Sequence, residues 1–504
     1  MNTRKIVLSF AAVAAMATGA FGTTYYATPN PTYDPETGAE VATLATTVDG
    51  VQVTAWSITN AFSRYANVVL LKGTYDYSKF TNPDPSTSGQ LVWIDGKHGA
   101  DLLTARGETD DPDDVVIIGP GLAQNMRCFY FQRKVSLSGV TIRDFGCSGN
   151  GGAVLFTPSS TGTVFSKCKF FNNTGSTGGA VAGNSNLQIT DCVFDGNRYS
   201  YVTTTAGQGG GGAVTASKCL RCTFIDNGPV TVDPTVKNQA RGGAVWASQC
   251  TNCVFIGNRA YNGGAAAGWT SSSTAATCYQ CAFTNNVTFS SYGVVANVDC
   301  EHCDFYGNEA AYVIYPAQTT VCCNIVSNHL SSGVVLQGKL KNCLVARNRC
   351  EGNNVLSGSN FENCLVASNV SKLRVVESCS WAANTVFTDN RNVNGNIVTV
   401  LSGTPACTNC VADGNVPTGV SEENWTKKTT AEIKSCYAFD DNDVPTSLVR
   451  NGMAKKILLD KGFDLGQTAE DLDLAGKPRV FNDIIDIGCW EWPGPFPGLM
   501  LILR

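Results

Sequence analysis

Apolar and polar residues alternate in a six-residue pattern that returns eleven times along the chain. The pattern is Cys-x-Phe-x-x-Asn with small variations, as in Cys168 to Asn173, and successive copies start 20 to 31 residues apart. A repeat of this length predicts a solenoid, in which each unit buries its apolar face against its neighbours. The asparagines that end the copies are Asn173, Asn197, Asn227, Asn258, Asn286, Asn308, Asn328, Asn348, Asn369, Asn390 and Asn415.

The spacing within each copy predicts a short strand followed by a turn. The Cys and the Phe lie two residues apart, so on an extended strand they point to the same side. The residue between them varies freely (Lys169, Val193, Thr223, Asp304), which is typical of an outward position. The Asn comes three residues after the Phe, where a turn is expected, because Asn tolerates left-handed backbone and bonds to neighbouring backbone groups.

A second apolar run follows several of these turns and is often opened by two glycines, as at Gly178-Gly-Ala-Val181 and Gly211-Gly-Ala-Val214. Short strands with no helical stretch between them exclude leucine-rich and helical repeats. They predict a parallel β-helix, in which each strand pairs with its copy in the next coil at roughly 4.8 Å. We expect the stacked asparagines to form a hydrogen-bonded ladder, and the stacked Cys and Phe side chains to fill the bore.

The paired FxxN and GGA[IV] phrases resemble the repeats of chlamydial polymorphic outer-membrane proteins. The resemblance covers about residues 145–415, and both phrases recur in the same order throughout. It implies a right-handed parallel β-helix. The chain departs from that family in having no long C-terminal autotransporter barrel, so the resemblance does not imply self-translocation through an outer membrane.

The flanks resemble a wider group of secreted bacterial β-helix proteins that are pectate-lyase-like in shape. Residues 68–75 are similar to the usual opening strand of that group. Residues 471–479, followed by residues 486–491, are similar to its closing segment. In such proteins the closing segment precedes varied surface-anchoring tails, and residues 493–504 occupy that place.

The N-terminus predicts export. Arg4 and Lys5 are followed by an apolar stretch, and Ala20-Phe21-Gly22 is a small-x-small cleavage site, so residues 1–22 are interpreted as a signal peptide. A non-cleaved anchor is the alternative, which the short, Ala-rich run disfavours. No transmembrane helix is expected in the mature chain.

The remaining chain is divided into an N-terminal cap with the first coils (23–100), the β-helix repeats (101–416) and a C-terminal cap with a possible anchoring tail (417–504). An open β-helix end exposes unpaired strand edges. Ile58, Ala61, Phe62 and Tyr65 recur at helical spacing, which predicts a short helix over the N-terminal end. Residues 417–504 are expected to cover the other end.

Charge and composition exclude several functions. Charged residues make up only 15% of the 504 residues, the net charge is −5, and no basic block stands out, so nucleic-acid binding is not expected. Histidine occurs only at positions 98, 302 and 329, which leaves little material for imidazole catalysis or histidine metal sites. No cofactor is expected.

The 22 cysteines allow three interpretations: disulfides, metal ligands or packed thiols. Five CxxC pairs suggest zinc, but the second Cys of each pair is already explained as the inward residue of the repeat. Thr385 replaces it in one copy and is not a metal ligand. Packing as small apolar side chains is therefore favoured over metal binding. Most of these cysteines are expected to stay thiols and a minority to be bridged.

No convincing catalytic set is present. Glycoside hydrolysis needs two carboxylates that face one groove. Asp195 and Asp226 hold related positions on successive coils, but turn chemistry explains both. The acidic run 108–114 suggests Ca²⁺, with a solvated loop as the favoured alternative.

Two coils carry insertions at the same place, residues 198–210 and 228–241. Loops that leave successive coils at one register emerge side by side, and solenoid function usually lies in such loops. Tyr199, Tyr201 and Tyr261 belong to this corner and are candidate contacts to a sugar or a protein. The alternative is that these rings pack the loops onto the shaft.

The leading hypothesis is a secreted or outer-surface structural protein that acts in adhesion or envelope architecture. Its expected partners are cell-surface carbohydrate or protein, and the sequence does not determine its oligomeric state. The alternative is a carbohydrate-active enzyme of the pectate-lyase-like group, a polysaccharide lyase or glycosidase. A third hypothesis is metal storage by the CxxC rows.

Overall fold

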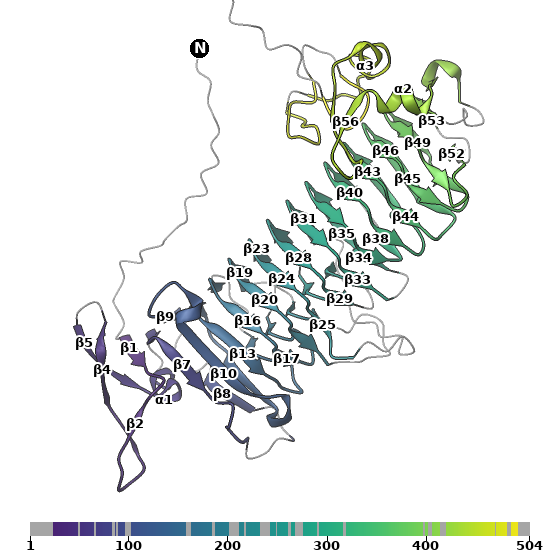
Figure 1. Ribbon diagram of the computed structural model, residues 1–504. Coiled ribbons are helices and arrows are strands. Elements are labelled where there is room, and N and C mark those ends of the chain that lie inside the picture. Colours follow the sequence, from purple (N-terminus) through teal and green to yellow (C-terminus); the bar gives the residue numbers. More distant parts are fainter. Residues whose placement is uncertain are drawn as a thin grey trace, which may run out of the picture.

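The chain forms one elongated shaft of stacked β-coils, with small additional elements at both ends (Figure 1). The computed structural model describes residues 24–491 except for short gaps. These gaps are residues 49–50, 65–66, 83–85, 87–88, 96–101, 158–162, 184–186, 201–210, 216–217, 232–241, 248, 261–263, 268–275, 290–291, 316–318, 397–398, 402–405, 414–419, 469 and 481–484. The predicted signal peptide and the tail 493–504 lie outside the described residues.

One 15-stranded sheet follows the six-residue pattern along the whole shaft, with every strand parallel to the next. In that pattern Phe170 pairs with Phe194, and Phe194 with Phe224. The strands are β7 (Gly73–Asp76), β10 (Val115–Gly121), β13 (Thr141–Phe145), β16 (Lys169–Phe171), β20 (Val193–Asp195), β24 (Thr223–Ile225), β28 (Val254–Ile256), β32 (Ala282–Thr284), β36 (Asp304–Tyr306), β40 (Asn324–Val326), β43 (Leu344–Ala346), β46 (Leu365–Ala367), β50 (Val386–Thr388), β54 (Cys410–Ala412) and β55 (Trp425–Lys427).

A 28-stranded sheet forms the opposite wall and takes two strands from a typical coil, such as β18 (Val181–Ala182) and β19 (Leu187–Thr190). Very short strands such as β17 (Thr174–Gly175) and β29 (Arg259–Ala260) form a third face. The fold class, a parallel β-helix, is therefore confirmed.

The bore is packed by columns of identical side chains. Six phenylalanines of successive coils stack face to face, with ring centroids 4.7–5.1 Å apart and planes within 4–9° of parallel. Coil spacing imposes this geometry, because parallel strands place equivalent residues directly above one another. The six are Phe170, Phe194, Phe224, Phe255, Phe283 and Phe305.

The asparagines at the turns are buried and hydrogen-bonded from coil to coil. The ten that the structure describes are at most 2% exposed. Asn258 is typical: its Oδ1 accepts from the backbone N and the Nδ2 of Asn227, and its Nδ2 donates to Phe224 O. The next Asn repeats this arrangement, since Asn286 Oδ1 accepts from Asn258 N and Nδ2. Asn415 lies outside the described residues.

The left-handed backbone is adopted by the residue before each ladder asparagine and not by the asparagine itself. Asn172 has a φ of 49° and Gly196 a φ of 64°. In the first coils this position alternates between Asn or Asp and Gly, for a steric reason. A Cβ on Gly196 would lie 2.6 Å from Asn172 Oδ1, and a Cβ on Gly307 would lie 2.6 Å from Asn285 Oδ1.

The double-glycine motif results from close backbone approach. A Cβ on Gly179 would overlap the carbonyl oxygen of Gly212 in the next coil, and a Cβ on Gly212 would overlap that of Gly243. The second glycine of each pair therefore forms a column in which no side chain fits.

All 22 cysteines are buried thiols, so the expectation that a minority is bridged differs from the structure. Stacked parallel strands hold the Cβ vectors nearly parallel, which is unfavourable for disulfide geometry. The thiols donate to backbone carbonyls instead: Cys222 Sγ lies 3.5 Å from Ile189 O and 3.4 Å from Leu220 O.

The N-terminal end begins with β1 (Thr24–Ala27), β4 (Thr43–Val48) and β5 (Val51–Trp56), followed by helix α1 (Ile58–Phe62). Ile58, Ala61 and Phe62 of the predicted helix are buried, and the Phe62 ring lies 5.3 Å from that of Phe129. Tyr65 lies outside the described residues. That this helix covers the N-terminal end of the shaft stays a prediction.

The C-terminal segment lies along the side of the last coils as well as at their end. Outward residues of β43, β46 and β50 are apolar and pack with buried residues of helices α2 (Thr430–Lys434) and α3 (Gly452–Ile457). Asn384 fixes this segment, since its Nδ2 donates to Phe463 O (2.8 Å) and its Oδ1 accepts from Phe463 N (2.7 Å). At the end of the bore, Trp425 of β55 is 2% exposed and stacks on Phe387.

The two pieces of the predicted closing segment are joined by buried polar contacts. Arg479, fully buried, donates through Nη2 to Asp486 O at 2.6 Å. Glu491 Oε1 accepts from Asp486 N (3.0 Å), while Glu491 N donates to Asp473 Oδ2 (2.8 Å).

We predict that Asn258→Ala destabilises the shaft by about 3 kcal/mol, because it removes the acceptor of the buried Asn227 N–H and Nδ2 and one donor to the Phe224 carbonyl. Urea unfolding followed by circular dichroism measures the loss. Asn353→Ala is the matched control, since that residue is exposed and outside the ladder. Equal stability of the two variants would contradict the ladder's role.

We also predict that the native protein reacts very slowly with a thiol reagent and that all 22 thiols react after denaturation. All 22 are buried, so the reagent has little access to them. Burial also raises the pKa of the Cys128 thiol well above its usual value and that of Cys350 to about 12, so these two hold little thiolate at pH 8. Titration in the absence of reductant, before and after guanidinium is added, counts the thiols that react in the native and in the denatured protein. A large deficit after denaturation would show disulfides.

Candidate ligand-binding pocket

The two predicted insertions start from neighbouring strands of the third face. Their first residues form β21 (Arg198–Tyr199) and β25 (Gly228–Pro229), which pair in parallel with Arg198 opposite Gly228. The next coil continues the column, because Arg259 N in β29 donates to Asn227 O at 2.8 Å. Both strands directly follow a ladder asparagine, so the ladder sets their register.

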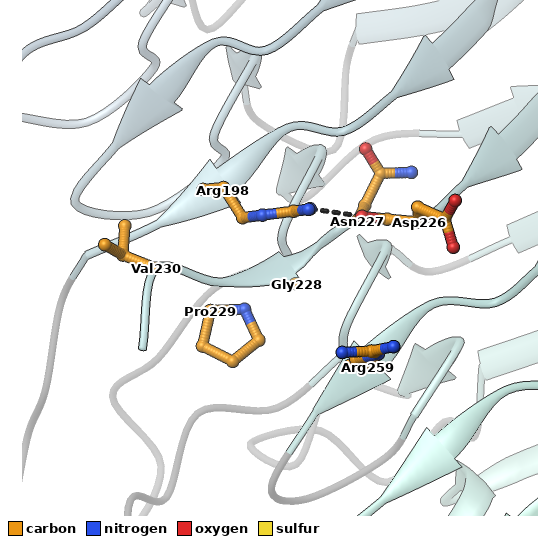
Figure 2. A pocket seen from close by; sticks show the side chains of 7 residues that line it. All are labelled: Arg198, Asp226, Asn227, Gly228, Pro229, Val230 and Arg259. Atoms are coloured by element: carbon orange, nitrogen blue, oxygen red, sulfur yellow. Dashed lines mark hydrogen bonds between the residues drawn. The ribbon is translucent and has the colours of Figure 1, made fainter. Parts of the chain in front are cut away.

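A pocket of about 410 Å³ opens at this corner. Arg198 and Arg259 lie on either side of the β25 strand, and Gly228 contributes no side chain between them (Figure 2). A Cβ at Gly228 would lie 2.7 Å from Arg259 O, so the hollow depends on this glycine. Pro229 and Val230 supply an apolar wall.

The two guanidinium groups differ in environment. Arg198 is half-buried and donates through Nη1 to the backbone oxygens of Asn197 (3.3 Å) and Asp226. Burial lowers the pKa of Arg198, but an arginine stays charged at neutral pH. Arg259 is exposed, and within the described part of the chain its side chain has no recorded hydrogen bond or ion pair. Arg259 therefore offers an exposed positive charge to an anion.

Two carboxylates lie beside the arginines. Asp226 lines the pocket, and Asp195 is half-buried on the preceding coil. The pKa of Asp195 is raised, first by burial and then by the negative charge of Asp226, with Arg198 opposing the shift. Two acids of unlike environment are the minimum that a glycosidase needs.

Of the three tyrosines predicted as ligand contacts, the structure describes only Tyr199. Tyr199 lies in β21 with its side chain 2% exposed. That burial favours the interpretation that this ring packs the loop onto the shaft. Tyr201 and Tyr261, like most of both insertions, lie outside the described residues, so their role as ligand contacts stays a prediction.

The acidic run 108–114 is neutralised by lysines. Lys72 Nζ lies 2.9 Å from Asp114 Oδ2, and Lys167 Nζ lies 2.6 Å from Asp110 Oδ2. Hydrogen bonds to Lys167 and to Thr109, respectively, lower the pKa values of Asp110 and Asp114. Such pairing favours the solvated-loop interpretation over a Ca²⁺ site.

Within the described ranges, no cluster of three or more His, Cys, Asp or Glu side chains is arranged to hold a metal ion. The same residues include no helix long and apolar enough to cross a membrane.

In comparisons with known proteins, the chain is similar to solved structures in fold only. No protein-family model and no curated protein matches the chain. Similar solved structures include a tailspike protein double mutant of E. coli bacteriophage HK620 in complex with pentasaccharide (12% identity, TM-score 0.33, 65% of this chain and 66% of that one). Another is PfbA, a surface adhesin of Streptococcus pneumoniae (13% identity, TM-score 0.28, 71% of this chain and 87% of that one). A third is pectate lyase Pel9A (11% identity, TM-score 0.28, 93% of this chain and 96% of that one).

The chain thus spans just under two thirds of the tailspike's length, and none of these likenesses carries an argument about its activity. The resemblance to the chlamydial repeats stays a prediction.

Sequence reasoning located the corner but missed its arginines. Arg198 and Arg259 are 61 residues apart, and an isolated arginine beside an Asn turn has no distinctive pattern. The available signal was the alignment of the ladder asparagines, which places the residue after Asn197, Asn227 and Asn258 in one column.

Proposed function

We propose that this chain is an exported, surface-located or secreted β-helix protein that binds a ligand in an adhesive or structural role. The observation that carries the proposal is the pocket at the insertion corner. There Gly228, which has no side chain, lies between Arg198 and Arg259 on adjacent strands of a sheet. Rigid scaffolds that present loops and a preformed pocket are typical of binding proteins. The predicted signal peptide supports export.

The chemistry of the pocket favours a carbohydrate that carries carboxylate or sulfate groups. Arginine binds such oxyanions through two parallel N–H donors. Arg259 is charged and exposed, so a ligand in the pocket can reach its guanidinium group. Pro229 and Val230 offer an apolar surface to the sugar ring. The volume of about 410 Å³ lies within the usual range for small-ligand sites.

We predict that Arg259→Gln weakens binding to acidic polysaccharides by roughly tenfold, the loss expected for one charge-assisted contact. Binding to polygalacturonate and to chondroitin sulfate, measured by surface plasmon resonance with the intact protein, tests this. Binding is expected to fall as salt is raised.

The control is Arg349→Gln, in the same column of the third face but ion-paired with Glu351 at 2.9 Å. No binding of the unmodified protein to either polymer, or equal losses in both variants, would refute this assignment.

Carbohydrate cleavage is the second candidate, favoured by the unlike environments of Asp195 and Asp226. With its raised pKa, Asp195 would serve as the general acid and Asp226 as the partner carboxylate. Ligand binding by the arginines would then precede hydrolysis at the same corner.

If the chain is a hydrolase, Asp195→Asn and Asp226→Asn each abolish release of reducing ends from a bound polysaccharide while leaving affinity largely intact. The rate would decline as the pH rises through the raised pKa of Asp195, because the general acid loses its proton. A reducing-sugar assay across pH 4 to 8 measures this. Binding without any release of product excludes the enzymatic candidate and leaves the binding role standing.

A further inference from the structure

Two aromatic residues, one exposed and one half-buried, point outward from neighbouring strands of the first coils, near the N-terminal end of the shaft (Figure 1). Trp93 in β8 (Gly89–Ile94) is 53% exposed and pairs in register with Tyr130 in β11 (Met126–Phe131). Their centroids are 6.4 Å apart and their planes within 9° of parallel. Leu155 of β14 (Val154–Phe156) continues the column.

The ring pair is held in a fixed orientation by polar contacts at its edge. Trp93 Nε1 donates to Gln132 Oε1 at 3.3 Å, and Gln132 Nε2 donates to the Tyr130 hydroxyl at 2.8 Å. Arg127 of the same strand is only 5% exposed, and its guanidinium carbon lies 5.8 Å from the centroid of the Tyr130 ring. The platform is therefore preorganised, and a ligand does not have to order it.

A polar column runs beside the aromatic one. Asp95, Gln132 and Thr157 occupy the next outward position on the same three coils, since Gln132 N donates to Ile94 O and Thr157 N donates to Phe131 O. Gln132 is half-buried and Thr157 is exposed. Flat apolar rings thus lie next to a carboxylate, an amide and a hydroxyl.

We propose that Trp93 and Tyr130 form a saccharide-binding platform for a neutral sugar chain that lies along the shaft axis. A sugar ring has an apolar C–H face, which stacks on the indole and phenol rings, and a rim of hydroxyls, which bind to the polar column. A protein partner fits less well, because a stable interface buries roughly 800 Å² on each side and this platform is only two rings wide.

This site is independent of the arginine pocket, and the probes separate the two. Neutral polysaccharides carry no charge for Arg259, so binding to them reports on the platform alone. If one site does not bind its polysaccharides, the proposal for the other site is unaffected.

The test is native affinity electrophoresis of the intact protein in gels that contain xyloglucan, galactomannan, laminarin or pullulan. At least one polymer is expected to retard the unmodified protein. Trp93→Ala should weaken that binding roughly tenfold, the loss expected from removing one stacked ring, and Trp93→Phe should restore part of it.

Tyr306→Ala is the matched control, because Tyr306 of β36 is 47% exposed on the other wall. Trp93 is exposed, so its removal should leave the circular dichroism spectrum and the unfolding midpoint unchanged.

Three outcomes would overturn the proposal. One is the absence of retardation by all four polymers, and another is unchanged retardation of Trp93→Ala. The third is retardation that is lost after protease treatment of the polymer preparation, which would indicate a protein ligand for this face instead.

Discussion

The buried asparagine ladder is the interaction on which the rest of the structure depends. Each turn brings backbone groups into the interior, where unsatisfied donors and acceptors are costly. One Asn side chain binds two of these backbone groups and the neighbouring Asn side chain, since Asn258 accepts from Asn227 N and Nδ2 and donates to Phe224 O. Because the same residue recurs in the next coil, the ladder holds the coils in a single register.

Register turns every position of the repeat into a column. In the bore the columns are uniform, and phenylalanines or thiols pack against their own copies. On the surface the members of a column differ from coil to coil, and two such columns form the candidate sites. Gly228 between Arg198 and Arg259 leaves a pocket, whereas Trp93 beside Tyr130 forms a platform. Both candidate sites arise from substitutions at outward or corner positions that leave the stacking intact.

The same logic explains the C-terminal end. The residue that follows the Cys, or Thr385 in its place, is polar in some earlier coils (Lys169, Thr223, Asp304) and apolar in others (Val193, Val254), but in the later coils it is apolar each time: Leu344, Leu365 and Val386. That change was readable in the sequence, because an outward position that becomes apolar predicts a covering element. From their position in the chain, residues 417–504 are expected to cover the open end alone. In the structure this segment also packs on the outer face of the sheet.

The sequence by itself determined the repeat, the inward residues, the turn positions and hence the β-helix, because strand periodicity and turn chemistry are local properties. It also located the corner where the insertions leave the shaft. Only the tertiary structure decided which residues of different coils meet. Arg198, Gly228 and Arg259 come together only when coils of unequal length are stacked. Loop lengths vary while the ladder keeps its register, so distance along the chain says nothing about distance in space.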